Sequence, residues 1–323
     1  MNKDFVYAGE LAAFCTTLCW SLGIFPFTEA ARRLGPNSVN HFRILLAALF
    51  LSIACLVFLP YGTSAFFSRA LEGHWLWFGL SGIVGLALGD YFGFTAFAIL
   101  GTRIGSIFTT LSPAAALLLG YFLVNEQINL IGILGIFITI TGVIWVSVSK
   151  SQTAHLKDHG HGSIRKGVVF AIASALCQGF GVVLANKGFV YKINGEDLPA
   201  LHATWLRMVT AAGGMYLFTI LRGRLQDTIR PVLQNKNKGN WMAVAGTLLG
   251  PVVGVSFSMY AIALLKDKPS VAQTIFSLVP VFVLPLAWLF YREKITWKAI
   301  AGALIAIAGV MILIWRDELY SRF

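Results

Sequence analysis

The chain has 323 residues, of which 57% are hydrophobic and only 12% are charged, and its formal net charge is +11. A soluble domain carries roughly twice this share of charged residues, so the composition excludes an ordinary soluble enzyme or binding domain. Most of the basic residues lie in or near the connecting segments, where they indicate orientation in a membrane rather than binding to nucleic acid. The partners expected are a lipid bilayer and a small-molecule substrate.

Apolar runs of about 20 residues recur along the chain, and each can cross the ~30 Å hydrocarbon core of a bilayer. They must be helices, because an open sheet edge leaves backbone groups unsatisfied in lipid. The first run is too long for a signal peptide, and more spans follow it. The fold class predicted is an all-α polytopic membrane protein with ten transmembrane helices. They are placed at 7–28, 39–59, 75–99, 104–124, 128–148, 167–190, 199–221, 241–264, 270–290 and 297–315.

The two halves of the chain repeat one plan. Residues 106–143 recur at 273–310 at a fixed offset, with a proline, a glutamate and two glycines in the same places. The longest polar connection separates spans five and six, so we predict a first five-helix repeat at 1–148, a linker at 149–166 and a second repeat at 167–323. An odd number of helices per repeat inverts the second half in the membrane. Inverted repeats around a midplane site are typical of secondary transporters.

Two segments carry a resemblance to a known family. They are LSPAAALLLGYFLVNEQ (111–127) and SLVPVFVLPLAWLFYREK (277–294), each followed by a Gly-x6-Gly pattern. With their flanking spans they resemble the ten-helix EamA-type branch of the drug/metabolite transporter superfamily, over almost the whole chain. The resemblance implies export or exchange of small metabolites through a central cavity, without ATP. From the residues themselves, neither a cofactor nor a metal is expected. The first copy departs from the family pattern with Asn-Glu-Gln at 125–127, which we interpret as drift at a surface turn.

Asp90 is the first candidate for a functional residue, because it lies well inside the third span. A carboxylate at that depth costs at least ~2.5 kcal/mol on insertion scales, so it faces the bundle interior or water. It is either a proton-coupling or substrate-binding acid, or a structural carboxylate tied to an arginine of a neighbouring helix. Its counterpart in the second repeat is Val255, so the symmetric position lacks the acid.

Arg43 and Arg207 occupy matching positions, one or two turns inside spans two and seven. Either arginine extends its guanidinium to the headgroups, or it pairs with an acid or an anionic substrate at a cavity mouth. Arg43 and Asp90 differ by roughly two turns in depth, which a long arginine side chain could bridge.

The substrate is expected near the midplane, between spans one, three and four of one half and six, eight and nine of the other. Trp20, Tyr91, Gln178, Tyr260 and Gln273 are predicted to contribute to one pocket there. Their flat apolar surfaces with amide or hydroxyl groups suit an amphipathic metabolite. Pro113 and Pro280 break a backbone hydrogen bond in spans four and nine, and they are the candidate hinges.

Glu126 and Glu293 fall at short turns, where each is predicted to cap the helix that follows it. Glu29 and Lys187 occupy matching positions with opposite charges, and each is expected to pair locally. In spans three and eight a small residue recurs every fourth position, which favours close packing or a sliding contact. No catalytic or metal-ligating motif stands out.

The sequence therefore predicts a secondary active transporter, an exporter or exchanger, for a small amphipathic metabolite such as an amino acid. Protons are the candidate coupling ion. Two alternatives stay open: a passive facilitator without ion coupling, and a membrane-embedded lipid-modifying enzyme. Basic residues favour both termini outside, whereas related ten-helix transporters favour both inside. A monomer and a homodimer are equally compatible with the sequence, and the membrane of a bacterial host would be the inner one.

Overall fold

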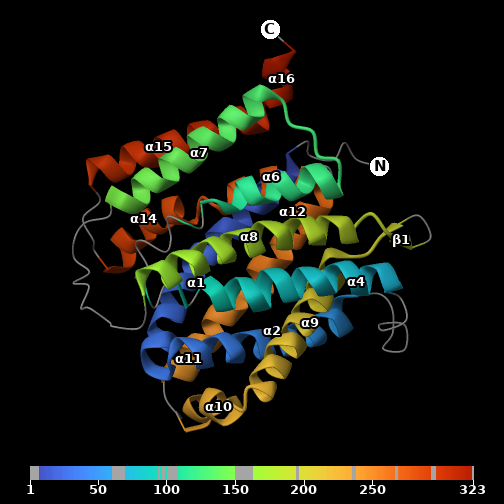
Figure 1. Cartoon of the computed structure of the whole chain (residues 1–323), viewed down its shortest axis with the longest axis vertical. Helices are drawn as coiled ribbons and strands as arrows, with labels where there is room; N and C mark the ends of the chain where they lie inside the picture. Colours follow the sequence, from blue (N-terminus) through green and yellow to red (C-terminus); the bar gives the residue numbers. More distant parts are fainter. Residues whose placement is uncertain are drawn as a thin grey trace.

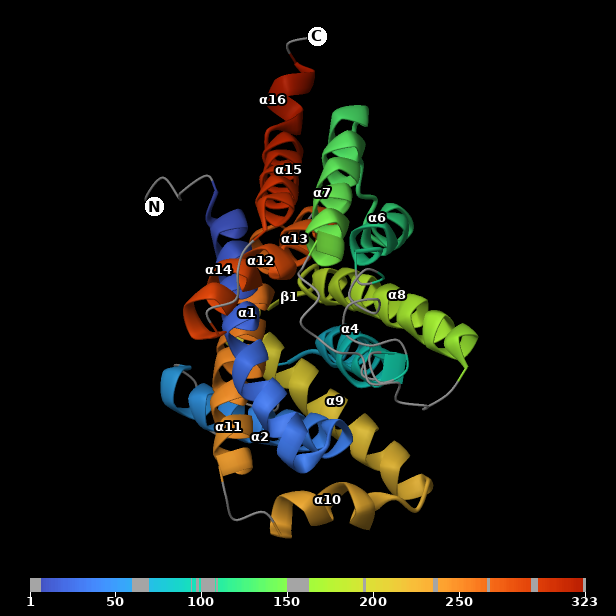
Figure 2. The ribbon, with the colours of Figure 1, turned by 90° about the vertical axis from the view of Figure 1, so that its left-hand side faces the viewer.

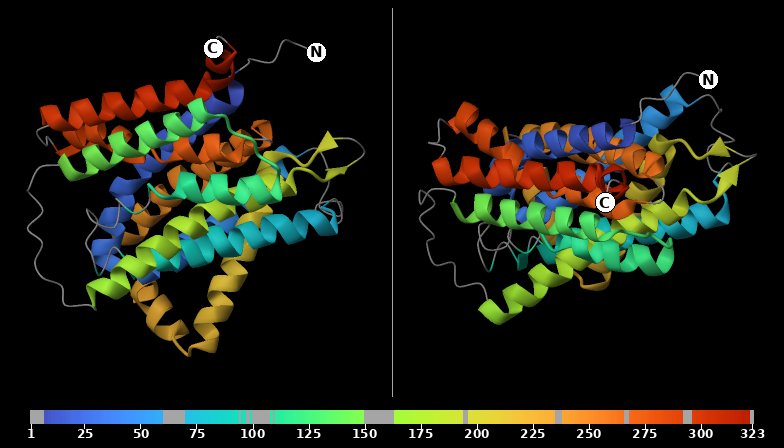
Figure 3. Two further views of the ribbon diagram at one scale, coloured as in Figure 1. Left: turned by 45° about the horizontal axis from the view of Figure 1, so that its top comes forward. Right: turned by 90° about the horizontal axis from the view of Figure 1, so that it is seen from above.

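The computed structural model describes residues 7–59, 70–93, 95–96, 99, 108, 110–149, 163–193, 196–234, 238–265, 268–291 and 296–321. The first half contains α1 (Ala8–Leu34), α2 (Pro36–Phe58), α4 (Glu72–Ser81), the π-helical η1 (Gly82–Leu88), α6 (Ser112–Leu123) and α7 (Leu130–Ser149) (Figure 1). The second half contains α8 (Ile164–Gly188), α9 (Ala200–Leu221), α10 (Leu225–Gln234), α11 (Lys238–Thr247), the π-helical η2 (Leu248–Gly254), α12 (Val255–Leu264), α13 (Pro269–Phe276), α14 (Val279–Tyr291), α15 (Trp297–Ile314) and α16 (Arg316–Tyr320). Between α8 and α9, β1 (Lys192–Ile193) and β2 (Glu196–Asp197) form a small antiparallel hairpin at one end of the bundle (Figure 3).

Seven of the described helical segments are long and apolar enough to cross a membrane. Shorter apolar helices are α6 and Leu130–Trp145 of α7. The chain is therefore an integral, multi-pass, all-α membrane protein, while the count of ten spans stays a prediction. The indole of Trp315 donates a hydrogen bond to the hydroxyl of Tyr7 (3.1 Å), so the two ends of the described chain lie on the same side. The seven segments are 8–34, 37–58, 72–93, 164–188, 238–264, 269–286 and 297–314.

The two halves contact each other through equivalent pairs of elements. The first helix of each half packs against the third span of the other: α1 lies along α11, η2 and α12, and α8 lies along α4 and η1. The small residues of the third spans form these contacts. A Cβ atom added at Gly85 would lie 3.3 Å from the Cα atom of Gly181, and one added at Gly250 would lie 3.3 Å from the ring of Phe27. Both π-helical segments therefore lie at the interface between the halves.

Helices that are equivalent in the repeat pack antiparallel to each other. In α7 and α15, which lie side by side in Figures 1 and 2, Gly135 faces Leu313 while Gly142 faces Ala306. In α2 and α9, His41 shares a hydrogen bond with Thr219 (2.7 Å), and Ser52 accepts one from Trp205 (2.8 Å). Early residues of one helix thus meet late residues of its equivalent in both pairs.

The predicted fourth and ninth spans are interrupted just before their prolines. In the ninth, α13 ends at Phe276 and α14 starts at Val279, so Pro280 is the second residue of a new helix. Pro113 is likewise the second residue of α6, after a turn at residues 110 and 111. A proline is tolerated in the first turn of a helix because its missing N–H would be unpaired there. The structure thus has breaks where the sequence predicted kinks.

Helix α1 covers the break between α13 and α14. The hydroxyl of Thr17 donates to the carbonyl of Ile275 (3.0 Å), and that of Ser21 donates to the carbonyl of Val279 (3.3 Å). In the other half, α8 covers the start of α6, where a Cβ atom added at Gly179 would lie 2.5 Å from the carbonyl oxygen of Ser112. The first helix of each half therefore contacts the equivalent break of the other half.

The glutamate cap was predicted on the wrong helix. Glu126, in the turn after α6, is 1% exposed and accepts hydrogen bonds from the backbone N–H (3.2 Å) and hydroxyl (2.5 Å) of Ser270. It therefore caps α13 in the second half rather than α7, the helix that follows it. A sequence shows which residues start a helix but not which distant carboxylate reaches them. Glu293 lies outside the described residues.

The two matching charges do not share a site. Glu29 forms ion pairs with Arg33 (2.6 Å) and Arg32 (3.9 Å) on its own helix, as predicted. Lys187 instead donates to the carbonyl of Leu123 (3.1 Å) at the end of α6. A cation there is favoured by the helix dipole.

Stability should fall with rising pH because of Glu126. Burial raises the pKa of this carboxyl from its usual 4.5 to about 7. Between these values the folded state keeps a proton that the unfolded state has lost, so stability present at low pH is lost as pH rises through about 7. A shift of this size corresponds to roughly 3 kcal/mol. Thermal unfolding in detergent from pH 4.5 to 8 should show this slope in the unsubstituted protein and a flatter one in Glu126→Gln. Equal slopes in both would contradict the assignment.

Candidate functional site at the interface of the two halves

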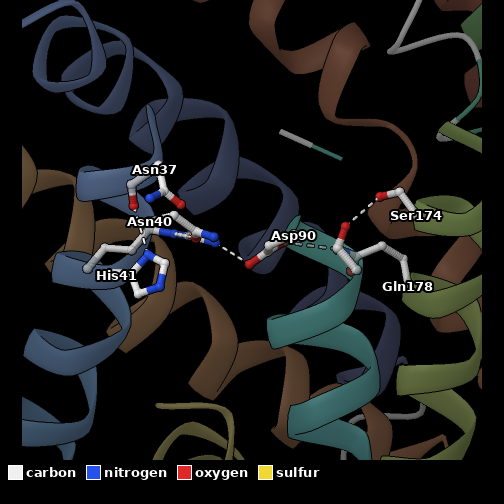
Figure 4. Close-up of polar contacts among 8 residues, drawn as sticks. Asn37, Asn40, His41, Asp90, Ser174 and Gln178 are labelled. Carbon is white, nitrogen blue, oxygen red and sulfur yellow. Dashed lines mark hydrogen bonds and ion pairs between the residues drawn. The ribbon is translucent and has the colours of Figure 1, made fainter. Parts of the chain in front are cut away.

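Asp90 lies between the two halves. It follows η1 in the third span, forms an ion pair with Arg43 of α2, and accepts a hydrogen bond from the amide of Gln178 of α8 (3.2 Å). The Asp90 and Arg43 side chains are 16% and 15% exposed. In Figure 4, Asp90 lies between residues of α2 on one side and Ser174 and Gln178 of α8 on the other. The carboxylate therefore joins first-half and second-half helices.

Neighbouring groups fix both members of the pair. The Nε of Arg43 donates to the side-chain oxygen of Asn40 (2.8 Å), and its guanidinium lies 5.6 Å from the ring centre of Phe27 in α1. Beside Asp90, the hydroxyl of Ser174 donates to the carbonyl of Gly89 (2.7 Å). A buried ion pair needs such additional hydrogen bonds, because its own attraction only roughly offsets the loss of hydration. Of the two roles considered for Arg43, contact with the headgroups and pairing with an acid, the structure shows pairing with Asp90.

Arg207 differs from its counterpart Arg43. It is 4% exposed, and its Nη1 lies 3.6 Å from the sulfur of Met259 in α12. Its Nε has no hydrogen-bond partner among the described residues. Its other terminal nitrogen lies beside Gly85 and Gly181, where a Cβ atom would approach it to 2.9 and 3.4 Å. Headgroup contact is therefore not the role of Arg207 in this conformation, since the guanidinium is inside the protein.

The remaining predicted residues are distributed around this interface. Trp20 packs against Phe276 (ring centres 5.2 Å apart) on α13, the helix that also carries the buried Gln273. Tyr91 packs against Phe218 (5.9 Å), and its hydroxyl accepts a hydrogen bond from Arg222 (3.4 Å).

Tyr260 is 49% exposed on α12, which places part of its ring toward lipid or solvent. A single pocket containing all five residues stays a prediction. Two shallow hollows, of about 260 and 240 Å³, lie at the end of α6 and between α14 and α15, away from Asp90.

Sequence reasoning missed three supporting residues: Asn40, Phe27 and Ser174. Asn40 lies three positions before Arg43, a spacing that brings two side chains together on one helix face. Ser174 and Gln178 are one turn apart on α8, opposite the small residues of the third span. These spacings were available in the sequence, whereas the contact of Phe27 with Arg43 depends on how α1 packs.

Known proteins share both the sequence pattern and the fold. The sequence profile of the EamA-like transporter family matches residues 7–148 and 165–315. A WAT1-related protein of Arabidopsis thaliana is 24% identical over 264 residues, which are 73% of this chain and 66% of that protein. The uncharacterized inner membrane transporter YedA of Escherichia coli (strain K12) is 29% identical over 135 residues, 41% of this chain and 40% of YedA. The matches thus span less than two thirds of either relative.

A solved crystal structure of another protein has the same fold, with a TM-score of 0.70 over 96% of this chain and 98% of the other, at 17% sequence identity. At that identity the likeness concerns the fold alone. The family profile, by contrast, covers nearly the whole chain. The chain therefore belongs to the EamA-like transporter family, within the drug/metabolite transporter superfamily.

Proposed function

We propose that this chain is a secondary transporter that moves a small amphipathic metabolite by alternating access between two inverted five-helix repeats. The observation that carries the proposal is the antiparallel packing of equivalent helices, α2 with α9 and α7 with α15. Two halves built alike but oppositely oriented can exchange their conformations. Such an exchange closes a midplane site to one side of the membrane and opens it to the other.

Two features of the interface support relative movement of the halves. The contacts of η1 with α8 and of η2 with α1 involve glycines of the third spans, so the third spans project no side chains from these positions into the facing helix. The breaks before Pro113 and Pro280 provide flexible points within α-helical spans, and both are covered by the other half. Sharp changes of helix direction at proline are common hinge positions. We assign the hinges to these breaks.

Asp90 is the proposed coupling acid, with protons as the coupling ion. Its present partners come from different halves, Arg43 from α2 and Gln178 from α8. A movement of α8 relative to α2 would therefore remove part of the stabilisation of the carboxylate. Binding a proton and pairing with Arg43 exclude each other, because a neutral carboxyl group no longer forms an ion pair. This links the protonation state to the arrangement of the halves.

The Asp90→Asn variant should separate coupling from transport. In proteoliposomes loaded with candidate metabolites, we expect it to abolish accumulation driven by a pH gradient, while exchange without a gradient persists. The amide keeps the shape of the carboxyl group but cannot release a proton. Asp317→Asn, which alters an exposed carboxylate paired with Lys268 (2.9 Å), is the matched control.

The outcomes of this assay separate the candidate functions. Accumulation that survives in Asp90→Asn would make Asp90 structural and favour a facilitator, an alternative that Val255 at the equivalent position supports. If the unsubstituted protein neither accumulates nor exchanges any metabolite of a broad panel, the transport proposal itself is wrong.

A further inference from the structure

The second half keeps a buried arginine, Arg207, that forms no ion pair with a described residue; Asp90, which is paired with Arg43, acts on it only from a greater distance. Arg43 has Asp90, but the residue equivalent to Asp90 in the second half is Val255, which is 5% exposed. Arg207 has no carboxylate within ion-pair distance among the described residues, and its Nε donates no hydrogen bond. The interface therefore holds two arginines and one acid in the described part of the chain, an excess of one positive charge.

An unpaired buried guanidinium is costly to keep. Burial removes its hydration, and a thioether sulfur such as that of Met259 is a weak acceptor. A membrane helix could carry leucine or methionine at this position without that cost. When a fold keeps a buried polar group at such a cost, the usual explanation is a functional role. Arg207 thus fits a group that receives its partner from outside the chain.

The position of Arg207 also fits a role in binding. Its guanidinium lies where α9, η1, α8 and α12 meet, so it contacts the parts of both halves that form their mutual interface. Gly85 and Gly181 lie beside it, and a Cβ atom at either position would approach its Nη2 to 2.9 or 3.4 Å, so glycine at both positions leaves room for the guanidinium. Asp90 lies little more than one helical turn beyond Gly85 in the same span.

We infer that the transported metabolite carries one carboxylate, and that Arg207 binds it. This rests on the transport function proposed above and names its substrate class. Guanidinium binds carboxylate through two parallel N–H···O hydrogen bonds, which would use the unpartnered Nε. A single negative charge neutralises the excess of one, whereas a phosphate dianion would leave an uncompensated negative charge. A carboxylate therefore fits the site better than a phosphate ester.

The test compares acids with their amides, which have nearly the same shape but lack the negative charge of the carboxylate. Leucine, phenylalanine and 3-phenylpropionate, each with its amide, are added to the detergent-solubilised protein, and binding is read from the shift in thermal unfolding. The acids should bind at least about tenfold more tightly than the amides, one charge-assisted contact being worth ~1.5–3 kcal/mol. Arg207→Met should lose this preference, Arg207→Lys should retain part of it, and the exposed Arg224→Gln should behave like the unsubstituted protein.

Each result bears on the inference. Arg207→Met should fold, because it removes a buried cation that has no ion-pair partner. If Arg207→Met does not fold, Arg207→Lys, which keeps the positive charge, takes its place as the test variant. Equal binding of acid and amide, absence of binding by every acid, or a full acid preference in Arg207→Met would overturn the inference. Counterflow of the same compounds in proteoliposomes separates it from the transport proposal. Binding that depends on Arg207 but occurs without counterflow would support the carboxylate site and refute the transport proposal. Counterflow without a preference for acids would support transport and refute the carboxylate site.

Discussion

Replacing Asp90 by leucine should lower the free energy of unfolding by about 3–5 kcal/mol, the usual cost of breaking a buried ion pair from one side. The substitution removes the carboxylate that faces Arg43 and the acceptor for the amide of Gln178. Arg43, which is only 15% exposed, would then lose its ion pair with Asp90. Thermal unfolding in detergent micelles measures the effect.

The double variant Arg43→Met, Asp90→Leu identifies the cause. With both charges gone, most of the lost stability should return, because replacing a buried ion pair by apolar residues is often neutral. The control is Glu29→Leu, which removes an acid from the exposed pair with Arg33 (2.6 Å) and should leave the stability nearly unchanged. A double variant as unstable as Asp90→Leu would show that the isolated guanidinium is not the source of the loss.

The duplication could be predicted because residues 106–143 match residues 273–310 at a fixed offset. The fixed offset between the repeats identifies equivalent helices, and their number per repeat predicts opposite orientations. The helices α2 with α9 and α7 with α15 pack antiparallel, while the inverted orientation of the two repeats stays a prediction. The ion pair of Arg43 with Asp90 could be suggested from their depths in neighbouring spans. The sequence could not decide between pairing and headgroup contact, because that depends on the rotation of each helix about its axis.

Other features depend on contacts that sequence spacing does not encode. The cap formed by Glu126 on α13 joins residues 144 positions apart. Tyr260 was grouped with the interior residues and is half exposed; the hydrophobic residues of α12 are spread around the helix, so its pattern does not reveal which side faces lipid. For Arg207, the sequence shows that the acid is missing from its half, but only the packing shows that its guanidinium is buried beside Gly85 and Gly181.

Substituting Gly142 by valine should separate α7 from α15 and prevent the normal fold. A Cβ atom there would lie 2.3 Å from the backbone nitrogen of Ala306 and 2.7 Å from the carbonyl oxygen of Gly302. Backbone atoms in a helix cannot move aside as a flexible side chain can. We therefore expect a cost at or above the upper end of the roughly 1–3 kcal/mol typical of overpacking. In a membrane, close contact of small residues is itself a main source of helix association.

Two other glycines provide the controls: the equivalent glycine of the second repeat, and a glycine that has open space around it. Gly309, the counterpart of Gly142, has an equally close contact, since its added Cβ atom would lie 2.4 Å from the backbone nitrogen of Thr139. Gly309→Val should therefore be as damaging. Gly213, inside α9, has no atom within 4 Å of an added Cβ, so Gly213→Ala should be neutral or stabilising by up to about 1 kcal/mol. Size-exclusion chromatography and thermal unfolding in detergent measure all three. If either valine variant remained monodisperse with unchanged unfolding, α7 and α15 could not pack as closely as the structure shows, and the antiparallel contact that supports inverted repeats would be lost with it.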